Sequence, residues 1–386
     1  MLAVYPARLR ARIKRSEGQV RVLMMGCGGI GGVVAANVIE HGYDVVAITH
    51  NAAITDAINS RGFQVRENER WRKVRARAWT AIPPDAGLFD FVFLATQPPQ
   101  VTEAAQSAAP FLRASGAMLC FQNGLCEQYI APLIGTDRTV GAIVAWGSSM
   151  TAPGVYDRTS GGGFVLGRLD GVVDDRFGPL AQLLGTIGPV EITRNLQGAR
   201  WSKLAINCAI SSLGTIGGRR LGRLIRYRFV RRLALEVMTE AVAVARRLKI
   251  HLEKISGTVD LEWLALTPAD VDGPGSPSLM AKHALLLAVG AKFRRLRSSM
   301  LLAIERGREP AVDYLNGEVV RRGAALDVPV PINSRVQELI RDIWQRRRQP
   351  SPALLRQLFA DSRSDARRMI RSPHRAPIDD DRRAAL

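Results

Sequence analysis

The sequence predicts an N-terminal α/β domain followed by an all-α domain. The chain has 386 residues, of which 47% are hydrophobic, and this length is enough for two globular cores. Apolar runs of strand length alternate with helical segments up to about residue 192. Beyond residue 193 the apolar residues recur with the period of a helix. We therefore place the two domains at 20–192 and 193–348.

The α/β domain opens with a strand and a glycine-rich turn. The apolar run VRVLMM occupies 20–25, and Gly26, Gly28 and Gly31 follow it in G-x-G-x-x-G spacing at the start of a helix. Such glycines let a pyrophosphate approach the free N–H groups of the helix. The motif predicts a Rossmann-type dinucleotide-binding domain; the alternative is a turn that only packs helix on strand. The expected cofactor-binding residues of this turn are Gly26, Cys27, Gly28, Gly29, Ile30 and Gly31.

The end of the second strand indicates which cofactor is bound. The helix runs to about His41, and DVVAIT at 44–49 is the second strand. NAD-binding domains usually carry an acid after this strand, whereas here His50 and Asn51 follow it and Asp44 lies at the opposite end. Because no carboxylate would repel a 2′-phosphate, we expect NADP, with His50 and Asn51 among the cofactor-binding residues.

Two further strands end in polar loops. They are predicted within FDFVFLATQPPQ (89–100) and GAMLCFQNGL (116–125). Ligands of open α/β sheets bind outside the carboxyl ends of the strands, so Asn123 is a candidate for the cofactor or the substrate. An Asn-Gly pair that only forms a turn is an equal alternative. Residues 139–171 add β-rich segments.

The second domain is predicted to be helical throughout. Its clearest helices lie within 200–216, 232–250, 296–307, 311–327 and 331–348. The most apolar segment, 279–293, contains Lys282, His283 and Lys292. It is too short and too charged to span a membrane, so we expect a buried or interface helix.

The first of these helices carries three polar residues on one face. Lys203, Asn207 and Ser211 are spaced four and four apart among mostly apolar neighbours. A lysine beside a ketone oxygen can stabilise the alkoxide that hydride transfer creates and can donate its proton. An asparagine one turn away can orient the lysine and the substrate. The alternative is an ordinary surface stripe.

Charge and cysteine content narrow the class of protein. The net charge is +19, and only seven of the 54 basic residues are lysine. Anionic small molecules suit this charge, but the arginines are scattered and aromatic residues make up 6%, so we expect no nucleic acid. Four cysteines without metal-ligand spacing indicate reduced thiols, no metal site and a cytoplasmic protein. We expect no membrane span, a basic arm at 1–19 that is not a secretory signal, and a basic tail at 349–386.

Together these motifs resemble the ketopantoate reductase (2-dehydropantoate 2-reductase) family from about residue 20 to 345. The resemblance rests on the glycine turn and on QNGL (122–125), WGSSMTAPGVY (146–156), LGRLDG (166–171), WSKLAIN (201–207), RSSML (297–301) and DYLNG (313–317). It implies a Rossmann domain, an all-α domain like the C-terminal domain of 6-phosphogluconate dehydrogenase, an active site in the cleft between them and NADPH as hydride donor. The implied binding partner is a small 2-oxo acid. A homodimer is one assembly that the chain could form.

The resemblance also implies roles for single residues. Lys203 matches the catalytic lysine, Asn207 and Ser299 match substrate-binding residues, Asn123 matches the asparagine near the nicotinamide, and Gln100 matches a cofactor-side glutamine. Other positions depart from the family pattern. Ser211 stands in place of the family's second asparagine on the lysine helix, and we expect it to bind substrate. Gln97 stands in place of a loop lysine, and we expect it to bind the cofactor. Asn51 replaces an arginine, Ala311 a glutamate with Glu309 close by, and Ala303 an aspartate.

These departures remove polar groups that would recognise a small hydroxylated substrate, and the segment 255–297 is longer than expected. The sequence therefore predicts an NADPH-dependent reductase whose 2-oxo acid is larger or less polar than 2-dehydropantoate. One alternative is a genuine 2-dehydropantoate 2-reductase of pantothenate synthesis. Another is an NADP-binding sensor or interaction protein with weak catalysis, which Lys203 and the intact glycine turn oppose.

Overall fold

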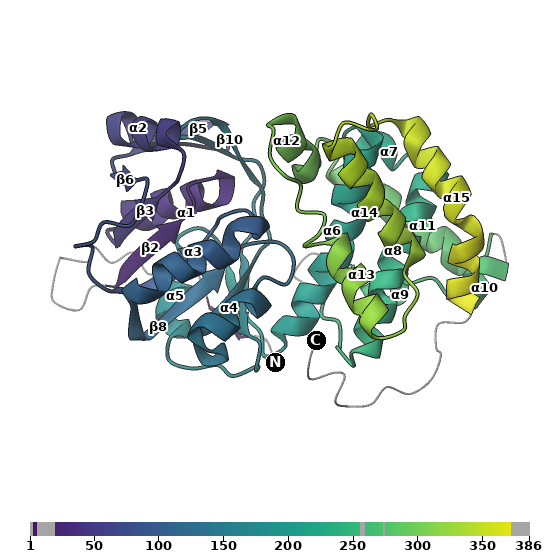
Figure 1. The fold of residues 1–386 in the computed structure, drawn as a ribbon, viewed down its shortest axis with the longest axis horizontal. Coiled ribbons are helices and arrows are strands. Elements are labelled where there is room, and N and C mark those ends of the chain that lie inside the picture. The colour runs from purple at the N-terminus through teal and green to yellow at the C-terminus, as the bar shows by residue number, and fades with distance from the viewer. Residues whose placement is uncertain (1–2, 6–19, 255–258, 273–274, 372–386) are drawn as a thin grey trace. The chain divides into compact units, whose positions relative to one another are not determined.

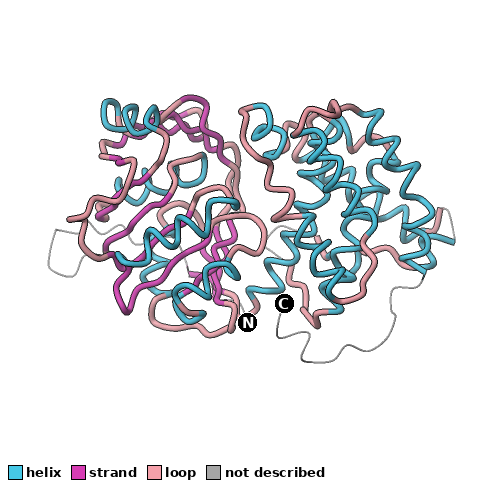
Figure 2. The backbone as a smooth tube through the Cα atoms, viewed as in Figure 1, coloured by secondary structure: helices cyan, strands magenta, loops and turns pink. Residues whose placement is uncertain are grey.

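The structure is a computed structural model that describes residues 3–5, 20–254, 259–272 and 275–371. The chain divides into two compact units, 1–196 and 197–386, and each is described by itself. In Figure 2 the described part of the second unit consists of helices and loops, whereas strands and helices alternate in the first. The expected fold class, a Rossmann-type α/β domain plus an all-α domain, is confirmed.

A nine-stranded sheet forms the centre of the first unit (Figure 1). Its order is β1-β13-β12-β9-β8-β7-β2-β3-β6. The strands from β9 to β6 run parallel to one another, whereas β12 pairs antiparallel with β9. The strand bounds are β1 Ala3–Tyr5, β2 Arg21–Met25, β3 Asp44–Ile48, β6 Ala78–Trp79, β7 Phe89–Leu94, β8 Leu112–Cys120, β9 Thr139–Val144, β12 Phe164–Arg168 and β13 Val190–Ile192.

Both faces of this sheet are covered, which explains the continuous apolar runs in its strands. Along β2, Val22 and Met24 face one core while Leu23 and Met25 face the other, as the two-residue period of a strand requires. The first core includes α1 (Gly29–Glu40) and α5 (Phe177–Gly185), and the second includes α3 (Val101–Ala108) and α4 (Glu127–Ile134).

A smaller sheet flanks α1 in the same unit. Its order is β10-β11-β4-β5, with β11 parallel to β4. The bounds are β4 Phe63–Glu67, β5 Arg70–Val74, β10 Ser148–Ala152 and β11 Val155–Arg158, and α2 (Ala52–Arg61) precedes β4. This sheet brings the segment 146–156 against the glycine turn.

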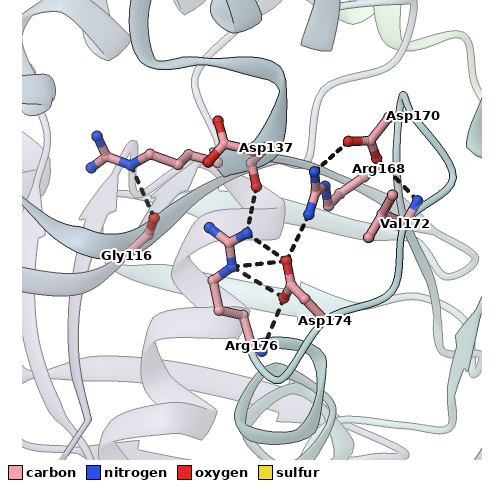
Figure 3. Close-up of polar contacts among 8 residues, drawn as sticks. Gly116, Asp137, Arg168, Asp170, Val172, Asp174 and Arg176 are labelled. Carbon is pink, nitrogen blue, oxygen red and sulfur yellow. Dashed lines mark hydrogen bonds and ion pairs between the residues drawn. The ribbon is translucent and has the colours of Figure 1, made fainter.

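The loop after β12 is held by the charged cluster shown in Figure 3. Arg168, which is buried, pairs with Asp170 and lies 2.7 Å from Asp174. Arg176 also pairs with Asp174, and its guanidinium donates to the carbonyl of Asp137 at 2.6 Å. These bonds keep the pKa of Asp174 below its ordinary value, chiefly through Arg176. The charged residues of the motif LGRLDG (166–171) therefore hold the loop that follows β12 in place.

The described part of the second unit is helical. Long α8 is packed by α9, α11, α13, α14 and α15 and is buried along most of its length. The bounds are α6 Leu196–Gly217, α7 Leu221–Leu224, α8 Arg228–Arg247, α9 Leu261–Leu264, α10 Pro268–Asp272, α11 Pro277–Lys292, α12 Ser299–Glu305, α13 Asn316–Ala325, α14 Pro331–Trp344 and α15 Pro352–Arg371.

The two predicted terminal extensions need correction. Most of the segment expected as a basic tail is α15, which buries Leu355, Leu358 and Ile370 and packs against α8 and α14. Its apolar residues recur at helical spacing, but the abundant arginines between them obscured that period. Within the expected N-terminal arm, Ala3–Tyr5 pairs antiparallel with β13. The rest of both extensions lies outside the described residues.

The apolar segment 279–293 forms α11, as expected, and one of its charges is buried. Lys282 Nζ lies 2.6 Å from Asp270 and donates to the carbonyl of Ala265 at 2.8 Å. Burial raises the pKa of Asp270, but the hydrogen bonds from Lys282 and Thr267 outweigh it and bring the pKa to about 2. This pair ties α10 to α11. Within the described residues, none of the helices combines the length and hydrophobicity that a bilayer crossing requires.

Candidate functional site

The loops that carry the predicted cofactor residues begin at one edge of the large sheet. The N–H of Gly26 donates to Ile48 O at 2.9 Å, and the N–H of Ala95 donates to Met25 O at 2.8 Å. The N–H of Phe121 likewise donates to Leu94 O at 3.0 Å. The ends of β2, β3, β7 and β8 are therefore aligned, and the structure brings together the segments that follow them.

Each glycine of the turn has a different structural reason. Gly26 has φ +104°, and a Cβ there would lie 2.8 Å from the backbone of Ala95. A Cβ on Gly31 would lie 1.9 Å from Gly26 O, so this glycine lets α1 pack on the strand. Gly28 is different, because a Cβ there would meet nothing within 4 Å. The glycine turn thus has room where a dinucleotide pyrophosphate would lie, and α1 has no acidic residue in its first turn.

A tyrosine from the small sheet fixes this turn. Tyr156 is buried on β11, and its hydroxyl donates to Cys27 O at 2.9 Å. A Cβ on Gly32 would lie 2.1 Å from the Tyr156 ring, so the ring needs a glycine beneath it. Burial raises the pKa of Cys27 to about 12, which keeps it a thiol. Tyr156 lies in the motif WGSSMTAPGVY, but no local pattern in the sequence indicates this role.

The residues after β3 agree with the expected absence of an acid. His50 is exposed, and Asn51 caps α2 by accepting from the N–H of Ile54 at 3.3 Å. Asp44 pairs with Arg21 at the opposite end of β3. Arg61, the first basic residue after Asn51, ends the ten-residue α2 and so lies roughly 15 Å along that helix from Asn51.

The remaining first-unit candidates are exposed in the loops after β7 and β8. Gln97 precedes the short helix Pro98–Gln100, Gln100 is its last residue, and Asn123 follows the buried Gln122. Gln122 Nε2 donates to Thr96 Oγ1 at 3.3 Å and so ties the two loops together. Gly124 has φ +97°, as the turn-forming alternative for Asn123 requires. An exposed Asn123 satisfies both alternatives.

In the second unit, α6 carries the polar stripe as expected. Lys203, Asn207 and Ser211 are each partly exposed, while Leu204 and Cys208 between them are buried. Asn207 Nδ2 is buried and donates no hydrogen bond within the described part of the chain. A buried amide N–H without an acceptor is costly, and a ligand oxygen would satisfy it.

The start of α12 is anchored on the same helix. Ser298 Oγ donates to Ser211 O at 2.7 Å and lies 2.7 Å from Thr215 Oγ1. A Cβ on Gly214 would lie 3.1 Å from Ser298 Cβ, so α6 and this serine pack closely. The predicted Ser299 is the next residue and is exposed. Ser298 therefore positions the segment, which leaves Ser299 available for a ligand.

Behind the stripe a buried polar chain holds α6 to three other helices. Ser212 Oγ donates to Asn316 Oδ1 at 2.5 Å, and Asn316 Nδ2 donates to Cys208 O at 3.3 Å and to Asn333 Oδ1 at 2.8 Å. Asn333 Nδ2 in turn donates to Glu240 at 2.7 Å. This buried chain, Ser212–Asn316–Asn333–Glu240, was missed in the sequence. Its one visible signal was the asparagine of DYLNG.

The carboxylate at the end of this chain is fully buried. Glu240 accepts the backbone N–H groups of Ile332 and Asn333, both at 2.8 Å, at the start of α14. Burial raises the pKa of Glu240 to about 8 against the lowering effect of these hydrogen bonds. No cluster of potential metal ligands occurs among the residues that the structure describes.

Two family sequence models match the chain. The model described as ketopantoate reductase PanE/ApbA matches residues 22–171, and the model described as ketopantoate reductase PanE/ApbA C terminal matches residues 195–343. The matches cover most of both units.

Named relatives and solved structures agree. A 2-dehydropantoate 2-reductase of Pyrococcus horikoshii is 25% identical over 83% of this chain and 97% of its own. A PanE/ApbA family ketopantoate reductase from Ralstonia eutropha has a TM-score of 0.70 and 26% identity over 86% of this chain and all of its own. A D-mandelate dehydrogenase solved with NADH and anilino(oxo)acetate shares the fold, with a TM-score of 0.72 and 18% identity over 85% of this chain and 99% of its own. The chain thus belongs to the ketopantoate reductase family and is an oxidoreductase acting between CH–OH and C=O groups.

Proposed function

We propose that the protein reduces the ketone of a 2-oxo acid with NADPH, using Lys203 as general acid. The observation that carries this proposal is the polar stripe on α6, where Lys203 and Ser211 are partly exposed and Asn207 has a buried donor without an acceptor. The start of α12, with Ser299, is fixed to the end of this stripe.

The roles follow from the chemistry of each group. Bound NADPH would supply the hydride. The Lys203 ammonium would stabilise negative charge on the ketone oxygen and donate the proton that completes the alcohol. Asn207 Nδ2 would donate to an oxygen of the 2-oxo acid, and Ser211 and Ser299 supply hydroxyls beside it.

The glycine turn supports a dinucleotide, and the end of β3 supports NADPH over NADH. Gly28 leaves open space at the start of α1, and neither His50 nor Asn51 is an acid. We propose contacts from Gln97, Gln100 and Asn123, which are exposed in the neighbouring loops. Because Arg61 lies at the far end of α2, the preference for NADPH rests on the missing carboxylate.

We further propose that the substrate is larger or less polar than 2-dehydropantoate. Ala303 and Ala311 stand where the family carries carboxylates, and each is half-buried without a polar side chain. A genuine 2-dehydropantoate 2-reductase is the second candidate, favoured by the name of the relatives. Glu309 is exposed between α12 and α13, and under that alternative it would replace the missing glutamate.

The first experiment measures NADPH oxidation with 2-dehydropantoate and with branched and aromatic 2-oxo acids. We expect kcat/KM to be lower for 2-dehydropantoate by roughly two orders of magnitude, the sum of three lost hydrogen bonds at about 1 kcal/mol each. A clear preference for 2-dehydropantoate would support the second candidate. No turnover with any of these acids would favour a sensor or interaction protein.

The second experiment tests the general acid. Lys203→Ala should lower kcat by about 10²–10⁴ while NADPH binding stays within about twofold. Lys73→Ala is a matched control, because Lys73 is exposed on β5. Normal turnover in Lys203→Ala would show that the stripe is only a helix surface. The homodimer, the cytoplasmic location and the lack of nucleic-acid binding stay predictions.

A further inference from the structure

An apolar cavity of about 50 Å³ lies within the second unit, between α6, α7, α8 and α11. On the same measure one water needs roughly 10–15 Å³, so the cavity holds several carbon-sized groups. Every residue that lines it is apolar or glycine. Such cavities stay dry and take up apolar molecules of matching size.

The cavity borders the polar stripe. From α6 it is lined by Ile206, Ala209, Ile210 and Leu213. Ile206 follows Lys203 by three residues and Ile210 follows Asn207 by three, so each isoleucine lies roughly 60° around the helix axis and about 4.5 Å along it from its neighbour in the stripe. Both isoleucines are only half-buried, whereas Ala209 and Leu213 are fully buried. The lining therefore runs from the edge of the stripe into the interior.

Helix α11 forms another part of the cavity wall. Leu286, Val289 and Gly290 of α11 line the cavity. A Cβ on Gly290 would lie 2.0 Å from Ile225 Cγ2, so the glycine lets α11 approach α7 closely. Helix α11 belongs to the segment 255–297, which we expect to be longer than in the family, and its residues give the cavity an apolar wall.

We propose that this cavity receives the carbon chain of the 2-oxo acid and that the chain is branched and aliphatic. This inference rests on the proposed function and names the class of its substrate. A cavity of 150 Å³ holds benzene, and this one is about a third of that size, so a branched chain of three or four carbons fits better than an aromatic ring. A hydroxylated chain would lose its hydrogen bonds to water without gaining others there.

The test uses a variant whose larger side chain fills part of the cavity, and it compares kcat/KM for two substrates. Ala209→Val adds two carbons to its wall, and Ala205→Val makes the same change on the same helix at a buried position that does not line the cavity. We expect Ala209→Val to lower the ratio of kcat/KM for 4-methyl-2-oxopentanoate to that for pyruvate by about tenfold. Ala205→Val should leave this ratio within about twofold.

A second variant enlarges the cavity, so that the inference can still be tested if Ala209→Val fails to fold. Leu213→Ala should raise kcat/KM for 3-phenyl-2-oxopropanoate relative to 4-methyl-2-oxopentanoate by about tenfold, since the wider cavity admits a ring. If the enzyme reduces 2-oxo acids but neither ratio changes, the cavity is a packing void and the inference is wrong. If the unaltered protein reduces no 2-oxo acid, the proposed function itself fails.

Discussion

The glycine turn of the first unit and helix α6 of the second unit differ in the groups that form their candidate sites. At Gly26, Gly28 and Gly31 the site is made of backbone, and missing side chains create the room. On α6 the site is made of side chains, and buried polar partners such as Asn316 hold the helix from behind. A backbone site needs particular residues at fixed spacing in one segment. A side-chain site needs partners from distant segments.

The difference predicts which changes damage the fold and which damage only binding. A new side chain at Gly28 enters open space, so it should affect the ligand alone. A truncated side chain at Asn316 removes bonds between helices, so it should affect the fold.

The largest effect is expected at Asn316. Asn316→Ala leaves Ser212 Oγ, Cys208 O and Asn333 Oδ1 without their partner in a buried place. We expect the free energy of unfolding in urea to fall by about 2–5 kcal/mol. Asn123→Ala, at an exposed asparagine, should change it by less than about 0.5 kcal/mol. Equal stabilities would show that the buried chain does not hold α6.

Glu240 should make stability depend on pH. Its pKa is raised from 4.5 to about 8 on folding, so between these values the folded state holds a proton that the unfolded chain has released. The contribution of Glu240 to the free energy of unfolding is complete below pH 4.5. It falls by about 1.4 kcal/mol per pH unit as the pH rises towards 8. Glu240→Gln should lower stability overall but remove this slope. An unchanged slope in that variant would assign it to another group.

A change at Gly28 should act on the cofactor. Gly28→Val places its side chain in the open space at the start of α1, and the backbone there, at φ −74°, accepts valine. We expect the NADPH Kd to rise at least tenfold, about 1.4 kcal/mol, with the thermal midpoint nearly unchanged. Gly161→Val is the control, because its side chain also enters open space. Unaltered NADPH affinity would place the cofactor elsewhere.

The smallest effect is expected at Asn51. Asn51→Asp adds a carboxylate after β3 and still caps α2, since aspartate is as good an N-cap as asparagine. The preference for NADPH over NADH should fall about three- to tenfold, measured as the ratio of the two Kd values. Asn51→Ser keeps the cap without the charge and should keep the preference. If both variants behave alike, charge at this position does not select the cofactor.

The sequence by itself determined the α/β and all-α units, the glycine turn and the stripe on α6. These features are periodic or local, so neighbouring residues alone specify them. The residues after β3 can likewise be read from the sequence, and none of them is the acid that NAD-binding domains usually carry there. It failed for α15, where dense arginines between the apolar residues resembled a charged tail.

Only the tertiary structure decided what holds and surrounds these features. Tyr156 packs on Gly32, which is 124 residues away in the sequence, and Ser212 bonds to Asn316, which is 104 residues away. No periodic pattern in the sequence relates residues that far apart. The apolar cavity of the second unit likewise exists because α6, α7, α8 and α11 leave space where they pack. Such contacts depend on the sum of packing in a whole unit, and a motif within one segment carries no record of it.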